Sequence, residues 1–324
     1  MMFSIIIPVK EINQYIIDFV PLILKQSYKK FEIIILPNDF PKKIPETLKN
    51  KKIKIIPSGA GGPAMKRDLG AEKSKGDILA FIDDDAYPSR DWLEKAEKEF
   101  NNDSVSAIGG PNLTPEKSNF FQKVSGDVLA SYLVSAGESG RYKIGKRKEI
   151  DDFPSCNLLI RKKVFKKVGG FDTGFWPGED TKLCLDIKEQ GGKIIYSPEV
   201  IVYHHRRKTF KEYLKQIFSY AKHRGYFAKK YPGNSAKLGY MIPSLFVLGL
   251  VTGGVLSYFS FIVRIAYLGV LSLYGILLLV ESVKTKKINY IIPFVIIAFT
   301  THITYGVGVF FGLFKKNLVS KYRT

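Results

Sequence analysis

Three consecutive carboxylates, Asp83, Asp84 and Asp85, follow directly after the apolar run Ile78–Ile82. Such a run is typical of a buried strand in an α/β sheet, and a buried strand cannot continue through three charges. Because neighbouring carboxylates repel one another, we expect a cation beside them. Mg²⁺ or Mn²⁺ fits best, since these hard ions bind carboxylate oxygens and share their remaining positions with phosphate oxygens. A solvated acidic turn is the weaker alternative.

The spacing of these acids also predicts their directions. Alternate residues of a strand share a face, so a strand that continued past Ile82 would point Asp83 and Asp85 together. Asp84 would then point away from them. Ligands of open α/β sheets bind at the carboxyl ends of the strands, which is where this group lies.

A second acidic pair, Glu179 and Asp180, follows Gly178 at the start of a predicted helix. Acids at a helix N-terminus are stabilised by the helix dipole, so capping is the simplest interpretation. A carboxylate held beside a metal-bound substrate would also serve as a general base. His204 and His205 end a later strand on the same edge of the sheet, where a pair is better placed to be functional than a lone histidine.

The elements that position these residues alternate between strands and helices. Apolar runs at residues 3–9, 31–36 and 53–56 read as buried strands, with helical spacing after the first of them. This alternation predicts a parallel, doubly wound α/β sheet. Glu11 and Asp39 follow the first two strands and could bind the base or ribose of a nucleotide. Taken singly, either acid is more often a helix cap or a turn residue.

A glycine-rich turn, residues 59–62, precedes Pro63 and the basic pair Lys66 and Arg67. Glycines let the backbone approach a ligand closely, and Pro63 suits the first turn of a helix. A helix N-terminus with two cations in its first turns could hold a pyrophosphate. The spacing is neither that of a P-loop nor that of a dinucleotide-binding fingerprint, so alone it is weak evidence.

The charge balance suggests an anionic partner. Fifty Lys and Arg against 30 Asp and Glu give a formal charge of +20. The basic residues cluster beside apolar segments, which favours a membrane surface and argues against nucleic acid. Cys156 and Cys184 read as buried thiols, and because no secretory signal opens the chain we expect the N-terminal domain in the cytosol.

Three apolar segments, residues 241–261, 265–281 and 290–313, have about the length that spans a bilayer. We therefore divide the chain into a catalytic domain (1–205), a basic interfacial segment (206–237) and a transmembrane domain (238–324). The interfacial segment carries ten Lys or Arg and has apolar residues at helical spacing, so we expect it along the cytosolic membrane surface.

The number of spans stays open at this point. Three spans from a cytosolic catalytic domain place Lys284, Lys286 and Lys287 inside, as the positive-inside rule prefers. They also place Lys315, Lys316, Lys321 and Arg323 outside, against that rule. Three spans are narrowly favoured, and a third segment that re-enters and returns to the cytosol is the alternative.

Several motifs occur in order along residues 3–225, namely Ser4-Ile5-Ile6-Ile7-Pro8-Val9, Lys66-Arg67-Asp68-Leu69-Gly70, Phe81-Ile82-Asp83-Asp84-Asp85, Val168-Gly169-Gly170-Phe171-Asp172 and Gly178-Glu179-Asp180. As a set they resemble inverting glycosyltransferases of family 2, which have the nucleotide-sugar-binding GT-A fold. The stretch from Gly109-Gly110-Pro111 to Phe121-Gln122-Lys123 and the apolar C-terminal part, with His302 and Tyr305, are similar to membrane-anchored succinoglycan-type exopolysaccharide transferases.

The resemblance implies roles for single residues. Asp83 and Asp85 would form the D-x-D site for metal and diphosphate, completed by His204 or His205. Asp180 would be the catalytic base with Glu179 beside it. The implied nucleotide-sugar site comprises Pro8, Glu11, Asp39, Lys66, Arg67, Asp83 and Asp84. Two departures concern this site: Asp68 stands where asparagine is commoner, and Asn38-Asp39-Phe40 replaces an Asp-rich turn.

The sequence thus predicts a multi-pass protein of the cell membrane with a cytosolic catalytic domain. It would use Mg²⁺ or Mn²⁺ to move a sugar from a nucleotide-diphosphate sugar to a hydroxyl of a lipid-linked saccharide. One alternative acceptor is polyprenyl phosphate itself, which is already anionic and needs no base. A nucleotide-sugar-binding membrane protein without catalysis is the alternative from another class. The intact Asp83, Asp85 and Asp180 argue against it, because a binder needs no base.

Overall fold

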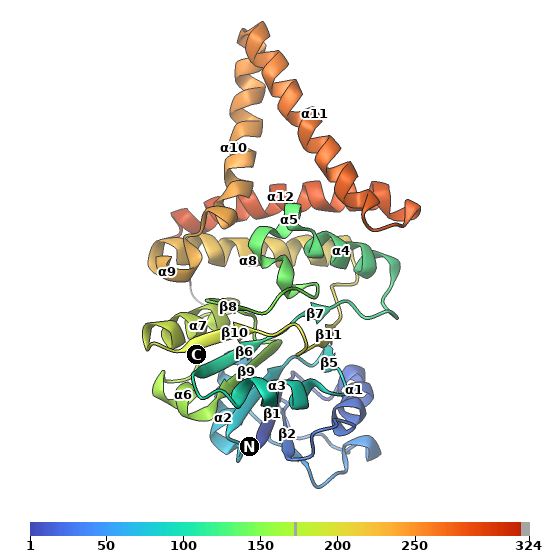
Figure 1. The fold of residues 1–324 in the computed structure, drawn as a ribbon, viewed down its shortest axis with the longest axis vertical. Coiled ribbons are helices and arrows are strands. Elements are labelled where there is room, and N and C mark those ends of the chain that lie inside the picture. The colour runs from blue at the N-terminus through green and yellow to red at the C-terminus, as the bar shows by residue number, and fades with distance from the viewer. Residues whose placement is uncertain (172–173, 319–324) are drawn as a thin grey trace. The chain divides into compact units, whose positions relative to one another are not determined.

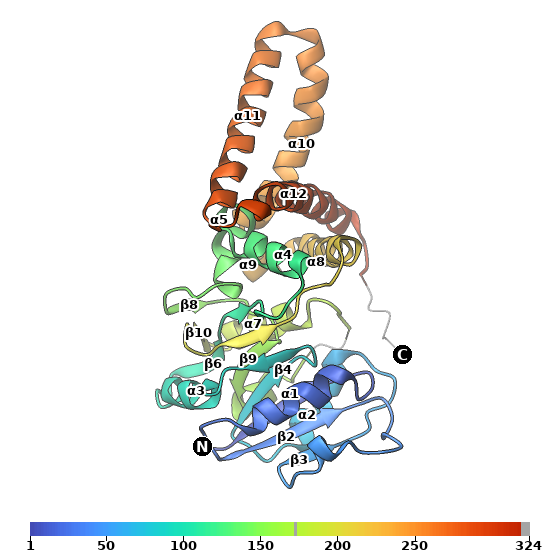
Figure 2. The same ribbon diagram turned by 90° about the vertical axis from the view of Figure 1, so that its right-hand side faces the viewer.

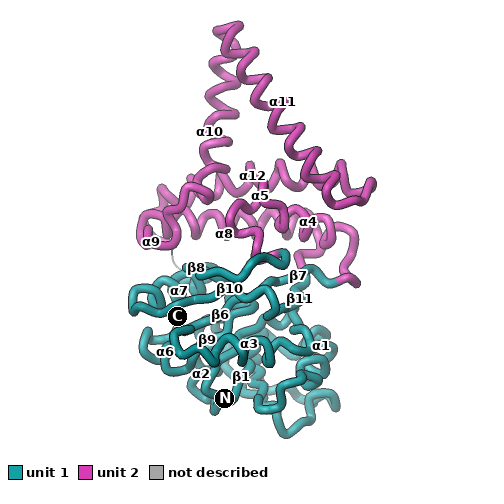
Figure 3. The backbone as a smooth tube through the Cα atoms, viewed as in Figure 1, with its two compact units in different colours: residues 1–115, 143–205, 319–324 teal, residues 116–142, 206–318 magenta. Residues whose placement is uncertain are grey.

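A computed structural model describes residues 1–171 and 174–318. By its contacts the described chain divides into two compact units (Figure 3). Unit 1 comprises residues 1–115 and 143–205, and unit 2 comprises residues 116–142 and 206–318. Residues 116–142, which the sequence analysis places within the range 1–205, therefore pack with the C-terminal helices.

Unit 1 is built on a sheet of eight strands in the order β3-β2-β1-β4-β9-β6-β10-β8 (Figures 1 and 2). The strands β9 and β8 run opposite to the others, so the sheet is mostly parallel. Its strands are β1 (Phe3–Pro8), β2 (Phe31–Leu36), β3 (Ile53–Ile55), β4 (Ile78–Ile82), β6 (Val105–Gly109), β8 (Lys148–Ile150), β9 (Asn157–Arg161) and β10 (Lys193–Tyr196).

Helices cover both faces of this sheet. One core cluster joins the sheet to α1 (Gln14–Leu24) and α3 (Trp92–Phe100), and a second joins it to α2 (Pro63–Lys73), α6 (Lys162–Lys167) and α7 (Glu179–Glu189). The four strands β1, β2, β4 and β9 are buried along their whole length, as their mostly apolar residues favour. Gly70 brings α2 close to β1, because a Cβ there would lie 2.6 Å from Ile6 Cγ2.

A smaller sheet lies beside the carboxyl end of β4. It has the order β5-β11-β7, with β5 (Ala86–Pro88), β11 (Val202–His204) and β7 (Asn112–Leu113). The strand β11 pairs antiparallel with β5, and His204 lies opposite Ala86. This pairing brings a histidine from the end of the catalytic region next to the residue that follows Asp85.

Unit 2 is helical. Its α-helices are α4 (Phe120–Ala130), α5 (Tyr132–Ser135), α8 (Phe210–Lys230), α9 (Pro232–Ser235), α10 (Leu238–Phe259), α11 (Phe261–Val283) and α12 (Ile291–Phe314). Short 3-10 turns cover Ala136–Arg141 and Ile288–Tyr290 here and Glu46–Leu48 in unit 1. A core cluster joins α4, α8 and α12, with Val128, Ile217 and Phe294 among its members.

Three helices of the described chain are long and apolar enough to cross a membrane: Leu238–Phe259, Phe261–Val283 and Ile288–Phe314. They correspond to the three apolar segments of the sequence. The predicted fold class, a mostly parallel α/β domain followed by apolar C-terminal helices, is confirmed. The helix α4 ends at Ala130, and a separate turn of helix, α5, follows Ser131.

Candidate active site

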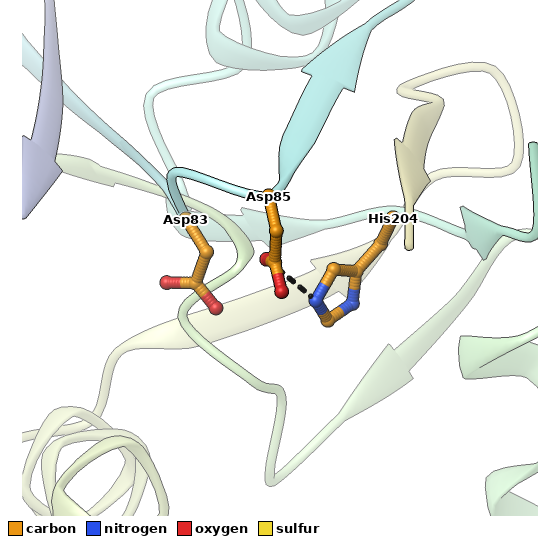
Figure 4. Close-up of side chains that lie close together, drawn as sticks. All are labelled: Asp83, Asp85 and His204. Carbon is orange, nitrogen blue, oxygen red and sulfur yellow. Dashed lines mark ion pairs between the residues drawn. The ribbon is translucent and has the colours of Figure 1, made fainter. Parts of the chain in front are cut away.

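The three aspartates lie where β4 ends and the chain turns into β5. Figure 4 shows Asp83 and Asp85 beside His204. Each of Asp83, Asp85 and His204 offers one ligand atom, and these atoms all lie within 4.8 Å of one another. His204 Nε2 lies 3.0 Å from Asp85 Oδ1. Burial alone would lower the pKa of His204, but the Asp85 carboxylate raises it to about 10. The cluster therefore combines two carboxylates and an imidazole.

Asp84 points elsewhere. Its Oδ2 accepts a hydrogen bond of 2.5 Å from Asn13 Nδ2, and the Asn13 side chain also caps the N-terminus of α1. Burial, followed by repulsion from Asp85, raises the pKa of Asp84 to about 6. The strand ends at Ile82, so the aspartates lie in a turn and not in a continued strand. The turn nevertheless places Asp83 and Asp85 together and Asp84 apart, as strand alternation predicted.

The two histidines lie in different surroundings. The His204 ring is part of the acidic cluster, whereas the His205 ring packs between aromatic side chains. Its centroid is 5.2 Å from that of Tyr15 and 5.6 Å from that of Phe19, with the latter ring nearly parallel. The His205 backbone N–H donates to the Asp85 carbonyl oxygen at 3.1 Å. His204 is thus the histidine whose side chain the structure groups with Asp83 and Asp85.

The second acidic pair is joined to the first through Arg67. Its Nη2 lies 2.7 Å from Asp83 Oδ1 and its Nη1 lies 2.9 Å from Glu179 Oε1. The Arg67 side chain is only 4% exposed, and within the described residues its Nε has no hydrogen-bond partner. Burial would lower the pKa of Arg67, but Asp83 and Glu179 raise it. Burial and the neighbouring Asp180 raise the pKa of Glu179 to about 7.

Asp180 is held by backbone N–H groups rather than by a cation. Its Oδ2 accepts from Ser155 N at 3.2 Å and its Oδ1 accepts from Thr181 N at 2.8 Å. Its pKa is raised by burial of the carboxyl group and then by repulsion from Asp152. The residue as a whole is partly exposed, whereas Glu179 is buried. A carboxylate with a raised pKa has the properties of a general base near neutral pH.

The basic and acidic residues expected around a nucleotide are spread along the ends of β1 and β2. The Lys66 ammonium is buried and donates to the carbonyl oxygens of Val9 (2.6 Å) and Leu36 (3.3 Å) and to Asn38 Oδ1 (2.5 Å). Asp39 and Glu11 are exposed. Lys66 therefore ties the carboxyl ends of two strands together, and burial lowers its pKa.

Pro8 is buried in β1, opposite Leu36 in the register with β2. Asp172, the last residue of one motif, lies outside the described residues. The adjoining Phe171 N–H donates to Asp68 Oδ1 at 2.9 Å, which ties this motif to α2.

Sequence reasoning missed several partners of the site. Asn13 orients Asp84, Ser155 binds Asp180, and Cys156 lies beside His204. A helix-capping pattern at Asn13 was the only local signal available. The others come from the loop before β9, whose approach to α7 and β11 is set by the three-dimensional fold.

The residues present suit a hard divalent cation. Two carboxylates and one imidazole are a common donor set for Mn²⁺, and carboxylates alone suit Mg²⁺. The Asp83 side chain is 30% exposed, so its oxygens remain open to a ligand from outside. Asp83, Asp85 and His204 are therefore the residues that would hold such an ion.

The fold is that of a GT-A-like α/β domain, with acids at the carboxyl edge of a mostly parallel sheet. A family model described as "Glycosyl transferase family 2" matches residues 4–169, about half of the chain. The chain belongs to this family, which confirms the resemblance seen in its motifs.

Relatives differ in how much of the chain they match. A dolichyl N-acetyl-alpha-D-glucosaminyl phosphate 3-beta-D-2,3-diacetamido-2,3-dideoxy-beta-D-glucuronosyltransferase of Methanococcus voltae is 24% identical over 98% of this chain and 99% of its own length. The succinoglycan biosynthesis protein ExoM of Rhizobium meliloti is 27% identical over 43% of each chain. Three further curated relatives are matched over only 37% to 47% of their length.

Among solved structures, a mannosyltransferase from Pyrobaculum calidifontis in complex with GDP-Man and Mn²⁺ is similar. The similarity has a TM-score of 0.58 at 17% identity and covers 97% of this chain and 88% of that one. At this identity the comparison supports the fold alone.

Proposed function

We propose that this glycosyltransferase depends on a divalent metal, inverts the anomeric centre, and moves a sugar from a nucleotide-diphosphate sugar to a hydroxyl group of a lipid-linked saccharide. The observation that carries the proposal is the pairing of two different acidic groups in unit 1. Asp83, Asp85 and His204 offer ligand atoms within 4.8 Å of one another, while Asp180 is partly exposed at the start of α7.

The proposed reaction is a single displacement. The acceptor hydroxyl oxygen forms a bond to the anomeric carbon while the bond from that carbon to the diphosphate oxygen breaks. The electron pair leaves with the nucleoside diphosphate, and Asp180 takes the hydroxyl proton. Mg²⁺ or Mn²⁺ held by Asp83, Asp85 and His204 would neutralise charge on the departing diphosphate.

The division of roles between the two neighbouring acids follows from their partners. Glu179 is 4% exposed and bound to the Arg67 guanidinium, which leaves it poorly placed to accept a proton from a substrate. Within the described residues Asp180 accepts hydrogen bonds from two backbone N–H groups, and the residue is partly exposed. Asp180 is therefore the base, and Glu179 positions Arg67 between the two acidic groups.

Two observations support a lipid-linked saccharide as acceptor. Unit 2 contains three helices with the length and apolar character of membrane spans. The relative that aligns over 98% of this chain carries a name that describes transfer to a dolichyl-phosphate-linked sugar. We further propose a multi-pass location in the cell membrane with unit 1 in the cytosol, because Lys284, Lys286 and Lys287 flank the apolar helices as cytosolic residues do.

A screen of nucleotide sugars tests the proposal. The full-length protein is incubated with each sugar donor, Mn²⁺ or Mg²⁺ and membrane lipid extract, and released nucleoside diphosphate is measured. Release should need one donor, the metal and the lipid extract together. Release that persists with EDTA would contradict the metal, and binding of donors without release under any condition would indicate a non-catalytic binder.

The acceptor is tested separately with purified lipids. Polyprenyl phosphate alone should not support turnover, whereas a lipid-linked saccharide should. If polyprenyl phosphate is accepted and Asp180→Asn has a mild effect, the acceptor is the phosphate itself, which needs no base.

A further inference from the structure

The three candidate membrane helices of unit 2 differ in how they are packed. In each helix we compare the most apolar stretch of 18 residues. The share of this stretch that is buried inside the protein is 11% in α10 and 6% in α11, but 44% in the segment Ile288–Phe314, which contains α12. Figures 1 and 2 show α10 and α11 as a hairpin, whereas α12 lies across their direction and alongside α8. The three helices are similar in length and hydropathy, but α12 differs from α10 and α11 in how much of it is packed against other helices.

Glycines allow α8 and α12 to approach backbone to backbone. A Cβ at Gly225 of α8 would lie 2.1 Å from the Val309 carbonyl oxygen of α12. A Cβ at Gly312 of α12 would lie 2.0 Å from the Lys222 carbonyl oxygen of α8, and one at Gly308 would lie 2.6 Å from Ala221 Cβ. These distances are too short for any side chain, so the two helices form one packed pair.

The pairing extends along both helices. Near the start of α8, the Tyr213 hydroxyl lies 2.8 Å from Thr301 Oγ1, and in the middle the rings of Phe218 and Phe311 are 5.6 Å apart. At its end, the Lys229 ammonium donates to the Leu313 carbonyl oxygen at 2.8 Å. Whatever direction α12 takes in the membrane, α8 therefore runs alongside it at a neighbouring depth.

The composition of α8 decides what that depth is. The helix contains one acid, Glu212, and six basic residues: Lys211, Lys215, Lys222, Arg224, Lys229 and Lys230. Charged side chains in the hydrocarbon core are strongly unfavourable. If α12 crossed the bilayer, α8 would be drawn through the core with these charges. A basic amphipathic helix is stable instead at the membrane surface, where its cations meet lipid headgroups.

The outward face of α12 suits the same location. Large apolar side chains that are exposed fall on one face of the helix, opposite the glycines that pack on α8: Ile292, Ile296, Phe299 and Phe314. Phe311 is also exposed and lies at the edge of this face, beside Phe218 of α8. This face is continuous in unit 2 with the α10–α11 hairpin, whose surface is also apolar. We infer that a lipid bilayer covers the apolar face of α12 and the apolar surface of the α10–α11 hairpin.

We propose that the chain crosses the membrane twice, through α10 and α11, and that α12 lies in the plane of the membrane surface with α8 packed beneath it. Lys284 and Lys287 after α11 and Lys315 after α12 are then on one side, as the positive-inside rule prefers. The three-span expectation placed them on opposite sides. Lys321 and Arg323, which that expectation also used, lie outside the described residues.

Reporters fused to either end of the full-length chain test the topology without reference to catalysis. Green fluorescent protein, which is fluorescent only in the cytosol, should be fluorescent at both ends, and alkaline phosphatase, which is active only outside, should be inactive at both. Both ends on the same side, whichever side it is, supports two spans. Ends on opposite sides would overturn the proposal.

Depth measurements then distinguish a helix in the surface plane from one that re-enters the membrane. Ile292→Trp, Phe299→Trp and Phe311→Trp report on α12, and quenching by brominated lipids reports the depth of each indole. The parent protein, whose Trp92 and Trp176 lie in unit 1, gives the background. The three variants should share one shallow depth.

Matched controls come from α10, where Leu248→Trp should be deep and Phe259→Trp shallow, because that helix crosses the core. In α10 the difference in depth between Leu248→Trp and Phe259→Trp gives the scale for a helix that crosses the core. If Phe299→Trp is deeper than the other two α12 variants by that same difference, the proposal is overturned.

Discussion

The two acidic groups of unit 1 are built from the same residue types but have opposite surroundings. At the end of β4, Asp83 and Asp85 share a partly exposed position with His204, and their ligand atoms converge. At the start of α7, Glu179 is buried against Arg67, while Asp180 is held by two backbone N–H groups. In the first group Arg67 and His204 each pair with one carboxylate, yet Asp83 stays 30% exposed and open to a ligand from outside, whereas in the second group Glu179 is buried with Arg67.

This difference indicates how the groups divide the chemistry. A partly exposed group of converging carboxylate and imidazole ligand atoms is suited to binding a cation together with the donor diphosphate. A carboxylate whose orientation is fixed by backbone groups is suited to removing a proton. Arg67 pairs with Asp83 in the first group and with Glu179 in the second, so we propose that it links donor binding to the position of the base.

The largest expected effect is that of Asp85→Ala. Without this carboxylate the cation site loses a ligand and His204 loses its partner, so turnover should fall by about 10⁴-fold or more, since a bound metal supplies several kcal/mol of transition-state stabilisation. Nucleoside diphosphate release measures this. Asp103→Ala, at a 96% exposed side chain, is the control. Turnover within tenfold of the parent would contradict the metal site.

Asp180→Asn should lower kcat by roughly 10²–10⁴-fold, the usual contribution of a general base. The amide keeps the shape of the side chain and can still accept one of the two backbone hydrogen bonds. Asp186→Asn, on the same helix and paired with Lys182, is the matched control and should stay near the parent rate. A fall in donor affinity with unchanged kcat would mean that Asp180 contacts the ligand instead.

Arg67→Lys should lower kcat/KM by about 10–100-fold, the usual effect of losing a partner that orients metal ligands. The guanidinium reaches Asp83 and Glu179 with two different nitrogens, which a single ammonium cannot do. Arg147→Lys, on an exposed pair with Glu99, is the control. If Arg67 has only a structural role, the thermal midpoint will fall without any change in the pH profile of kcat/KM.

The sequence was informative about the positions of the acids and less so about their partners. The run before Asp83 predicted a buried strand, and two-residue alternation predicted that Asp83 and Asp85 would separate from Asp84. The pairs Arg67–Glu179 and Asn13–Asp84 join residues 112 and 71 positions apart, so they depend on how strands and helices pack. Hydropathy likewise found α12 but not its packing on α8.

The smallest predicted effect concerns stability and pH. Burial raises the pKa of Asp68 from 3.8 to about 7. A raised folded-state pKa means that this carboxyl contributes most to stability below pH 3.8, and the contribution is lost as pH rises to about 7. Asp68→Asn cannot ionise and still accepts from the Phe171 N–H, so it should stabilise unit 1 above pH 7 by on the order of 1–3 kcal/mol.

The measurement is the thermal midpoint of parent and variant near pH 5 and pH 8. The midpoint of Asp68→Asn should fall less between the two than that of the parent. Asp18→Asn, on the surface of α1, is the control and should follow the parent. An equal fall in all three proteins would mean that Asp68 does not carry this pH dependence.

The division of roles between the two acidic groups is tested most directly by calorimetric titration of the full-length protein with UDP and GDP in the presence and absence of Mn²⁺. We expect Asp180→Asn to bind one of these nucleotides with the affinity of the parent and only when Mn²⁺ is present. Asp85→Ala should lose this Mn²⁺-dependent binding while keeping its thermal midpoint. Equal loss of binding in both variants, or Mn²⁺-dependent binding that survives in Asp85→Ala, would contradict the account.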